Sequence, residues 1–539
     1  MKKLMSLSLL LVFLFLVKAT AGQQPNMKER PNILLILADD MGYSDIGCFG
    51  GEIHTPNIDR LAGEGIRFTH MYTNAWCSPS RASLLTGLYP QQAGMGLLAE
   101  PRTGPEGPYE GYLNKNCVTL AEVLKAAGYA TALSGKWHLG DSSIYWPGYR
   151  GFDHAFGLIS GAANYFDISK TKSRSVVRKM ALNKDLYHPP EKGFYMTDAI
   201  TADALQVLDK YSDTLSNKPF FMYVAYTAPH WPLQALEKDI KKYKGKFHQG
   251  WDELRQQRFN RQKKLGIADK TDRLASRDID VKPWKTLSAK QKMAMEQKME
   301  VYAAQVDRMD QGIGQILDKL NSMHQKKNTI VIFLSDNGGC AEGSLWGFDK
   351  RNNGLKPGGV DSYMSYGQSW ANLSNTPFQY YKKSLFEGGI SAPMIIRWPK
   401  GINKKREGTI LKQVAHLTDI MPTLCALTGA QYPDTFHNRR IQSMEGQSLA
   451  MQIKGAPIQP HKPIYWSLEE RKAVILGNYK LETPSKSAAW QLYNLATDRI
   501  ESENLSDKEP ERVRKMKALW TAWAGKVHVF DGQRKNHTE

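Results

Sequence analysis

The sequence predicts an α/β fold in which helices flank a large mixed, mostly parallel sheet, with a smaller C-terminal α+β subdomain. Two apolar runs carry this prediction, Asn32–Ala38 and Thr329–Ser335, because each has the composition of a strand buried on both faces. Segments of helical periodicity alternate with such strands along the chain. This alternation favours a doubly wound α/β core.

The other core elements follow in chain order. Thr119–Ala127 has the spacing of an amphipathic helix, and strands are expected over Ala130–Ser134 and Pro219–Ala225. Apolar residues at helical spacing over Tyr302–Leu320 precede the second acidic strand, and Pro393–Trp398 supplies another short apolar run. Each element fits a sheet built from strand and helix in alternation.

Two regions depart from this pattern. Residues 236–299 are polar and rich in Lys, Arg and Gln, and are expected to form an insertion over the core. From about residue 445, four short strands and a final helix over Glu509–Trp523 predict a small antiparallel sheet with one helix. The expected organisation is a signal peptide over residues 1–21, a main domain over 28–445 and a C-terminal subdomain over 446–539.

The amino terminus predicts export. Lys2 and Lys3 precede the apolar stretch Leu4–Val17, and the small residues Ala19 to Ala21 form a cleavage site. The apolar stretch has about 14 residues, fewer than the roughly 20 that span a bilayer. We therefore expect a cleaved signal peptide without a membrane anchor, and a periplasmic or extracellular protein.

The composition indicates a globular protein with an anionic partner. Hydrophobic residues make up 41% and charged residues 23% of the 539 residues, which excludes disorder and coiled coil. Lys and Arg number 72 against 53 Asp and Glu, a formal charge of +19. This surplus favours an anionic ligand. Nucleic acid is a poor candidate because the basic residues are scattered and no binding motif is present.

Cysteine and helix chemistry single out one short segment. Cys77 precedes Pro79, which suits the first turn of a helix that continues to Gly87, and Ser78 or Ser80 is expected to cap it. Helix chemistry alone leaves a buried thiol and a reactive cysteine equally open. The other four cysteines are either buried thiols or form one or two bridges: Cys48, Cys117, Cys340 and Cys425.

Acidic pairs end the two buried strands. Asp39 and Asp40 follow the first, and Asp336 and Asn337 follow the second. Active sites of open α/β sheets lie outside the carboxyl ends of the strands. One such pair alone is more often a loop cap, but two pairs offer only oxygen ligands, which suits Ca²⁺ or Mg²⁺ and argues against zinc.

Four further polar residues are ambiguous in isolation. Lys136 and His138 lie two apart after a strand, so in an extended segment both project to one face. A solvated lysine and a packed histidine are the simpler interpretation of that pair. His230, between prolines, fits packing as well as catalysis, and Lys382 beside Lys383 fits a surface pair.

Together these segments resemble the active-site blocks of the sulfatase family, of the alkaline phosphatase superfamily, in the family's order from residue 32 to about 390. The blocks are the Asp39-Asp40 pair, Cys77-Ser78-Pro79-Ser80-Arg81 before Leu85-Thr86-Gly87, Gly135-Lys136-Trp137-His138-Leu139-Gly140, Ala228-Pro229-His230-Trp231-Pro232, Ser335-Asp336-Asn337-Gly338-Gly339 and Lys382 before Glu387-Gly388-Gly389. The resemblance implies an alkaline-phosphatase-like fold.

The resemblance also implies a cofactor and a modification. Cys77 would be oxidised to formylglycine by a maturation enzyme. One Ca²⁺ per chain, or Mg²⁺, would be bound by Asp39, Asp40, Cys77, Asp336 and Asn337. The implied reaction is sulfate ester hydrolysis, in which hydrated formylglycine attacks sulfur and then expels sulfate.

The remaining blocks take roles from the same resemblance. His230, with Lys382 close by, would protonate the leaving alcohol, and His138 would act as base when sulfate leaves. Arg81 would order the formylglycine and the metal site, and Lys136 and Lys382 would bind the sulfate group. We expect sulfated saccharides as substrates, with aryl sulfates as surrogates.

Two alternatives follow from the same residues. A phosphatase, phosphodiesterase or phosphonate hydrolase of the superfamily would share the acidic pairs, but those relatives use serine or threonine with additional zinc ligands. Cys77 and the all-oxygen ligand set argue against them. The second alternative is an exported protein that binds polyanions. It would explain the positive charge of the chain but would leave the active-site blocks without a role.

Overall fold

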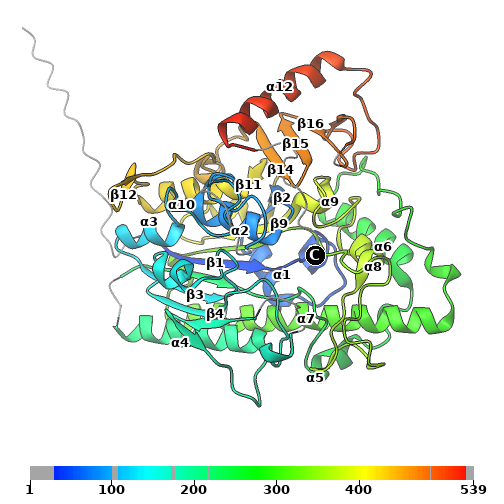
Figure 1. Ribbon diagram of the computed structural model, residues 1–539, viewed down its shortest axis with the longest axis horizontal. Helices are drawn as coiled ribbons and strands as arrows, with labels where there is room; N and C mark the ends of the chain where they lie inside the picture. Colours follow the sequence, from blue (N-terminus) through cyan, green and yellow to red (C-terminus); the bar gives the residue numbers. More distant parts are fainter. Residues whose placement is uncertain (1–29, 100–106, 172–176, 215–217, 486, 530–539) are drawn as a thin grey trace, which may run out of the picture.

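The computed structural model describes residues 30–99, 107–171, 177–214, 218–485 and 487–529. The predicted signal peptide, residues 1–21, lies outside this range. An eleven-stranded mixed sheet forms the centre, in the order β10-β2-β9-β8-β1-β7-β3-β4-β5-β6 with β11 beside β2 (Figure 1). No helix among the described segments is both long enough and apolar enough to span a membrane.

Four central strands run parallel. β1 (Asn32–Ala38) lies between β7 (Phe220–Ala225) and β8 (Thr329–Ser335), and β3 (Ala130–Gly135) pairs with β7. Every residue of β1 is fully buried except Asn32, which is almost so. The continuous apolar runs therefore form strands that are covered on both faces, as the sequence predicts.

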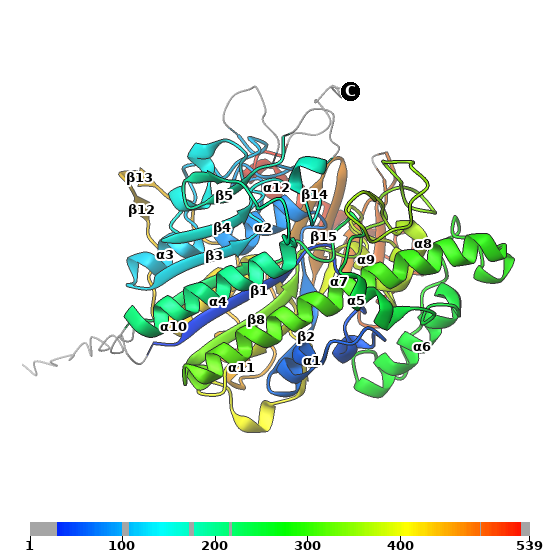
Figure 2. The same ribbon diagram turned by 90° about the horizontal axis from the view of Figure 1, so that it is seen from below.

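Two hydrophobic cores lie on the two faces of this sheet. Alternate residues of β1 belong to different cores, Leu34 and Ile36 to one and Leu35 and Leu37 to the other. The first face is covered by α1 (Pro56–Gly63), α4 (Met196–Thr214) and α7 (Ala289–Ser322), and the second by α2 (Cys77–Thr86), α3 (Leu120–Ala126) and α10 (Ile420–Thr428). Figure 2 shows α4 and α7 side by side across their face.

The flanks of the sheet make it mixed. β9 (Ser391–Arg397) runs antiparallel between β8 and β2 (Ile66–Tyr72), so β2 points the same way as β8. The remaining strands are β10 (Thr409–Leu411) and β11 (Ala415–His416) on one side, and β4 (His154–Leu158), β5 (Met180–Leu182) and β6 (Asp185–Tyr187) on the other. The predicted fold class is confirmed.

The C-terminal part forms a second, antiparallel sheet. Its strands are β14 (Ile464–Leu468), β15 (Arg471–Leu476), β16 (Tyr479–Glu482) and β17 (Gln491–Asn494), and α12 (Pro510–Lys526) packs on one face (Figure 1). Shorter elements precede it: α11 (Ala450–Lys454) and a hairpin of β12 (Thr435–Phe436) and β13 (Arg439–Arg440). The smaller C-terminal sheet is thus as predicted.

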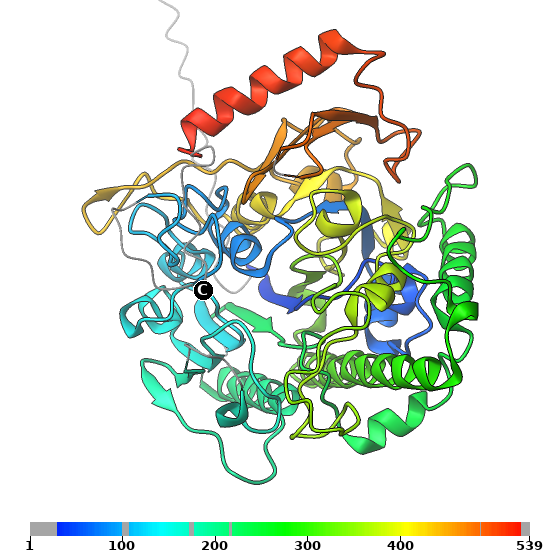
Figure 3. The same cartoon turned by 45° about the vertical axis from the view of Figure 1, so that its right-hand side comes forward.

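The polar stretch over residues 236–299 comprises α5 (Glu237–Ile240), α6 (Gly250–Leu265) and the start of α7. With α8 (Gly367–Ser374) it has a hydrophobic cluster of its own, in which Trp251 and Trp370 pack edge to face. Figure 3 shows this green part of the chain at the right of the molecule, where α6 packs against α8. The helix expected over Tyr302–Leu320 is the second half of α7, a longer helix that Ser288 caps.

Candidate active site

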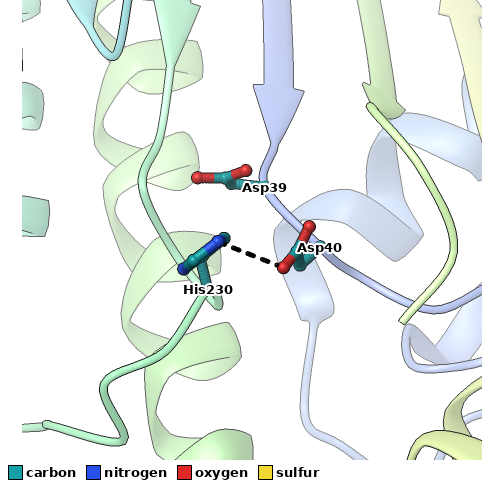
Figure 4. Close-up of side chains that lie close together, drawn as sticks. All are labelled: Asp39, Asp40 and His230. Atoms are coloured by element: carbon teal, nitrogen blue, oxygen red, sulfur yellow. Dashed lines mark ion pairs between the residues drawn. The ribbon is translucent and has the colours of Figure 1, made fainter. Parts of the chain in front are cut away.

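Six segments that are distant in sequence meet at one edge of the large sheet. β1, β3, β7 and β8 end there, β2 leads there to α2, and the segment before α9 (Glu387–Ile390) leads there to β9. Figure 4 shows Asp39 and Asp40 at the end of β1 and His230 on the loop that follows β7. One ligand atom from each of these three side chains lies within 4.8 Å of the others.

We call the charged groups at this edge the carboxyl-edge cluster: Asp39, Asp40, Arg81, Lys136, Asp336 and Lys382. Asp39 anchors one half of it. Lys136 Nζ lies 2.6 Å from Asp39 Oδ2, and Arg81 Nη2 lies 3.4 Å from Oδ1. The carboxylate is fully buried, so its charge is balanced by side chains and not by water.

Asp336 joins this half to β8. Arg81 Nη2 donates to Asp336 Oδ2 over 2.9 Å, and the Asp40 backbone N–H donates to Oδ1 over 3.1 Å. Burial raises the pKa of Asp336, and the neighbouring Asp39 carboxylate adds to the rise, while Arg81 opposes both. The acidic groups crowd closely enough that a further positive charge would be stabilised among them.

Asp40 anchors the other half. Its carboxylate accepts from Lys382 Nζ and from Asn337 Nδ2, each over 2.7 Å, and His230 Nε2 lies 3.3 Å away. Burial alone would raise the pKa of Asp40, but the charge of Lys382, the neighbouring His230 and the hydrogen bond from Asn337 lower it below its usual range. Asp40 therefore stays ionised.

Two oxygen atoms at the centre lack a hydrogen-bond donor. Asp39 Oδ1 and Asn337 Oδ1 are buried and accept no hydrogen bond from the described residues. Such orphaned acceptors are costly unless a cation or water satisfies them. Both belong to the predicted ligand set, and carboxylate and amide oxygens suit a hard cation. The residues present therefore fit a Ca²⁺ or Mg²⁺ ion.

His230 is held in place from both sides. Its Nδ1 lies 2.7 Å from the Trp231 carbonyl oxygen, which leaves Nε2 directed to Asp40 and to Lys382 Nζ, 3.5 Å away. Tyr165 Oη donates to the carbonyl oxygens of Thr227 and His230, over 2.7 and 2.9 Å. Burial lowers the pKa of His230 to about 4, since the nearby Lys382 opposes the effect of Asp40.

Cys77 is the first residue of α2. The predicted caps are wrong: the N-cap is Trp76, and the hydroxyls of Ser78 and Ser80 instead accept from the backbone N–H groups of Ala99 and Asn74. The helix ends at Gly87 as expected, with a left-handed φ of 72°. All of α2 is buried, so the residues around Cys77 pack against other parts of the protein on every side of the helix.

The Cys77 side chain sits among the charges of the cluster. Burial raises its pKa, while Lys136 and Lys382 lower it. As a plain thiol it is therefore protonated and a weak nucleophile. All five cysteines lie in the described part of the chain and are free thiols, so the bridges left open by the sequence are absent.

Lys136 and His138 both reach this edge, but not through strand alternation. β3 ends at Gly135, and His138 has a φ of 56°, so the expected extended segment is wrong. Gly135 is required there, because a Cβ would lie 1.9 Å from the Ala225 carbonyl oxygen. Burial, then the charge of Lys136, lowers the pKa of His138, and its Nδ1 has no partner among the described residues.

The rim contains groups that sequence reasoning missed. Glu342 accepts from Trp231 Nε1 over 2.8 Å and lies 3.5 Å from Lys383 Nζ. Lys350 Nζ lies 4.5 Å from the centre of the Trp231 ring. Both charges occur in a polar loop without periodicity or a recognisable motif, so no sequence signal separates them from ordinary surface residues.

Two protein-family models together match most of the chain. The family model Sulfatase matches residues 31–430, and the model N-sulphoglucosamine sulphohydrolase, C-terminal, matches residues 378–522. These matches include both sheets and every segment of the carboxyl-edge cluster.

Similar proteins span nearly the whole chain. An uncharacterized sulfatase of Schizosaccharomyces pombe is 35% identical, covering 93% of this chain and 94% of its own. The arylsulfatase of Klebsiella aerogenes is 37% identical, covering 80% and 93%. Human N-acetylgalactosamine-6-sulfatase is 27% identical, covering 90% and 77%. The crystal structure of Ps i-CgsB in complex with k-i-k-neocarrahexaose has a TM-score of 0.67 at 26% identity, covering 92% and 93%.

Proposed function

Because this chain belongs to the sulfatase family and is a sulfuric ester hydrolase, we propose that it acts through formylglycine at position 77 beside a bound divalent cation. We propose further that the protein is exported through the predicted signal peptide and modified by a formylglycine-generating maturation enzyme. Its substrates are sulfated saccharides, and aryl sulfates serve as surrogates.

The observation that carries the proposal is the charge balance around Cys77. Three buried carboxylates, of Asp39, Asp40 and Asp336, face three buried cations. A divalent cation added to this neutral set leaves a net positive pocket. A buried positive pocket with a helix N-terminus beside it favours a sulfate ester, which carries a negative charge.

Asp39, Asp40, Asp336 and Asn337 would hold the cation, and Cys77 in its modified form would complete the set. Ca²⁺ suits these oxygen donors, and Mg²⁺ is the other hard cation that does. When bound, the ion would polarise the sulfate oxygens and favour the deprotonated nucleophile. Arg81 and Lys136, which already bracket Asp39, would hold the sulfate and residue 77 in register.

A hydrated aldehyde at position 77 has two hydroxyls, so one can attack sulfur while loss of the proton on the other later expels sulfate. The alcohol that leaves in the first step needs a proton. Lys382 holds one, because Asp40 raises its pKa well above the ordinary value despite burial. His230 in its protonated form would donate the proton to the leaving oxygen, and Lys382, whose Nζ lies 3.5 Å from His230 Nε2, would donate a hydrogen bond to the same oxygen.

The second step needs a base, and His138 is the residue for it. Its lowered pKa keeps the imidazole neutral, so that it can accept a proton, and its buried Nδ1 has no competing partner among the described residues. Lys136 and Arg81 nearby would stabilise the departing sulfate by charge.

Support for a saccharide substrate comes from relatives. Human N-acetylgalactosamine-6-sulfatase and the N-sulphoglucosamine sulphohydrolase family are named for sulfated sugars, and Ps i-CgsB was solved with k-i-k-neocarrahexaose. These similarities extend over the C-terminal sheet as well as the main domain. We therefore place this chain among enzymes that desulfate sugars.

The proposal is tested by the mass of the peptide that contains residue 77, from protein exported by its native host. We expect an aldehyde or its hydrate there, together with hydrolysis of 4-nitrophenyl sulfate and of sulfated saccharides. Cys425, a free thiol in α10, provides the internal control and should stay unmodified. Full sulfatase activity in protein whose Cys77 is an unmodified thiol would contradict the mechanism.

A further inference from the structure

Three cations gather at the rim of the active site, in the loops beside Trp231. They are Arg178, Lys350 and Arg351. Lys350 Nζ lies 4.5, 4.6 and 5.6 Å from the ring centres of Trp231, Phe348 and Tyr363. Arg178 and Arg351 both lower the pKa of Tyr363 against the effect of burial, and Arg178 lowers that of Lys350, so all three charges lie near this aromatic cluster.

None of the three forms an ion pair with a carboxylate of the described chain, unlike their neighbours. Lys170 pairs with Asp361 at 2.8 Å, and Lys179 pairs with Asp141 at 2.7 Å. By contrast, the Nε atoms of Arg178 and Arg351 are buried and have no hydrogen-bond partner among the described residues. Arg351 donates one hydrogen bond, from Nη2, to the Lys170 carbonyl oxygen.

The carboxylates nearest to these cations have other partners, because Asp361, on which Arg351 acts, pairs with Lys170. Burial and the neighbouring Arg178 lower the pKa of Lys350, which Glu342 only partly offsets. Glu342 is already engaged, since it accepts from Trp231 Nε1 and faces Lys383. The arrangement therefore has a deficit of negative charge that an anionic ligand would fill.

The cluster borders the reacting groups. The rings of Trp231 and His230 are 4.5 Å apart, and Lys350 rests on the same Trp231 ring. A group bound by these cations would belong to a substrate whose ester also reaches His230. Cation–π contacts with three rings hold Lys350 in place, so part of the ordering cost of binding is met in advance.

We propose that Arg178, Lys350 and Arg351 form an accessory anion subsite, which binds a second anionic group on the saccharide that carries the scissile sulfate ester. This inference rests on the proposed function, and it narrows the substrate class to saccharides with at least two anionic groups. The second group is a sulfate ester or a carboxylate, since guanidinium groups bind both through paired hydrogen bonds.

Binding by calorimetry tests the subsite without turnover. The full chain carrying Cys77→Ala is titrated with three disaccharides: one monosulfated, one polysulfated, and one with a single sulfate and a uronate carboxylate. We expect the polysulfated probe to bind about tenfold or more tightly than the monosulfated one, because hydrogen bonds to charged groups contribute that much. The uronate probe shows whether a carboxylate serves as the second anion.

Variants assign the preference to these residues. Lys350→Met keeps the apolar stem over the aromatic rings, and Arg178→Gln keeps a hydrogen-bonding group. Each should lower the affinity for the polysulfated probe about tenfold relative to the monosulfated one. Lys264→Met removes one exposed positive charge on α6 and should leave that ratio unchanged.

The inference is overturned if the parent chain binds mono- and polysulfated probes equally, or if both subsite variants keep the parent's ratio. A ratio that falls equally in Lys264→Met would show general charge attraction only, and would also overturn it. These outcomes do not depend on residue 77 being modified. An unmodified Cys77 in active protein would refute the catalytic mechanism and leave the binding comparison intact.

Discussion

Two buried charged clusters differ in how their charges are satisfied. The carboxyl-edge cluster has three carboxylates and three cations, whereas the second cluster has three carboxylates and two cations. Both contain buried carboxylate oxygens without a hydrogen-bond donor among the described residues: Asp39 Oδ1 in the first, and Glu387 Oε1 and both Glu482 oxygens in the second. The second cluster, which we call the interface cluster, joins the large sheet to the C-terminal sheet. It consists of Glu387, Lys480, Glu482, Arg499 and Glu501.

The interface cluster is packed around one lysine. Lys480, fully buried on β16, lies 2.5 Å from Glu501, 3.7 Å from Glu482 and 3.9 Å from Glu387. Arg499 reaches Glu387 over 3.0 Å and also donates to the Thr69 carbonyl oxygen. These contacts connect the C-terminal sheet to α9 and to β2, so the cluster fastens two parts of the fold.

The difference separates two uses of buried charge. At the carboxyl edge the charges balance, and Cys77, the proposed nucleophile, lies beside them as the first residue of α2. In the interface cluster a surplus carboxylate is accommodated by a proton in the Glu482–Glu501 pair: burial raises the pKa of Glu482 to about 7 and that of Glu501 well above its ordinary value. We expect substitution of Cys77 at the edge to remove activity while sparing stability, and substitution of Lys480 at the interface to do the reverse.

The largest effect is expected for Cys77→Ala. Loss of the nucleophile should lower kcat/KM for 4-nitrophenyl sulfate by about 10⁴-fold or more, as removal of a nucleophile does in other hydrolases. The midpoint of urea unfolding should change little, because alanine fits at the start of the helix. Cys425→Ala is the matched control and should keep full activity. If Cys77→Ala kept its activity, this would contradict the proposed contrast between the two clusters.

Asp39→Asn tests the cation. Replacing one carboxylate of the ligand set should reduce metal content, measured by mass spectrometry of the purified protein, below one ion per chain. The several kcal/mol that a bound cation contributes to catalysis correspond to a loss of about 10³-fold in kcat/KM. Asp269→Asn, at an exposed ion pair with Lys412, should keep both metal and activity. Unchanged metal content in Asp39→Asn would argue against the ligand set.

Lys480→Met addresses the interface. Removing the cation leaves buried carboxylates without their partner, which should lower the free energy of unfolding by about 3–5 kcal/mol. Lys526→Met removes an exposed partner of Glu445 and should cost less than about 1 kcal/mol. Specific activity per folded molecule should stay near that of the parent. A stable Lys480→Met chain would show that the interface does not depend on this lysine.

Sequence reasoning located the carboxyl edge because strand ends and motifs coincide there. Asp39 and Asp336 follow apolar runs that can only be buried strands, so their convergence follows from parallel pairing. Sequence reasoning did not predict the interface cluster. Tyr479–Glu482 alternates apolar and polar residues as a half-exposed strand does, yet Leu481 packs under α12 while Lys480 and Glu482 face Glu387. Only the docking of one sheet on another decides whether a polar face meets water.

The smallest and sharpest test is the pH dependence of Glu482→Gln. In the folded chain the pKa of Glu482 is about 7, above its ordinary value of 4.5, so the folded state holds a proton that the unfolded state releases. Stability contributed by that proton is full below pH 4.5 and is lost as the pH rises through 7. Glutamine mimics the protonated acid and does not titrate, so the variant should lose less stability over this range.

The expected difference appears only on the basic side. At pH 8 Glu482→Gln should be about 1–3 kcal/mol more stable than the parent, whereas near pH 5 the two should be alike. Urea unfolding at both pH values measures this, and Glu191→Gln, at an exposed side chain, should follow the parent throughout. If the variant were less stable than the parent at pH 8, the charged form of Glu482 would be stabilising the interface. Both buried clusters would then rely on paired charge, and only the position of Cys77 would distinguish the carboxyl-edge cluster from the interface cluster.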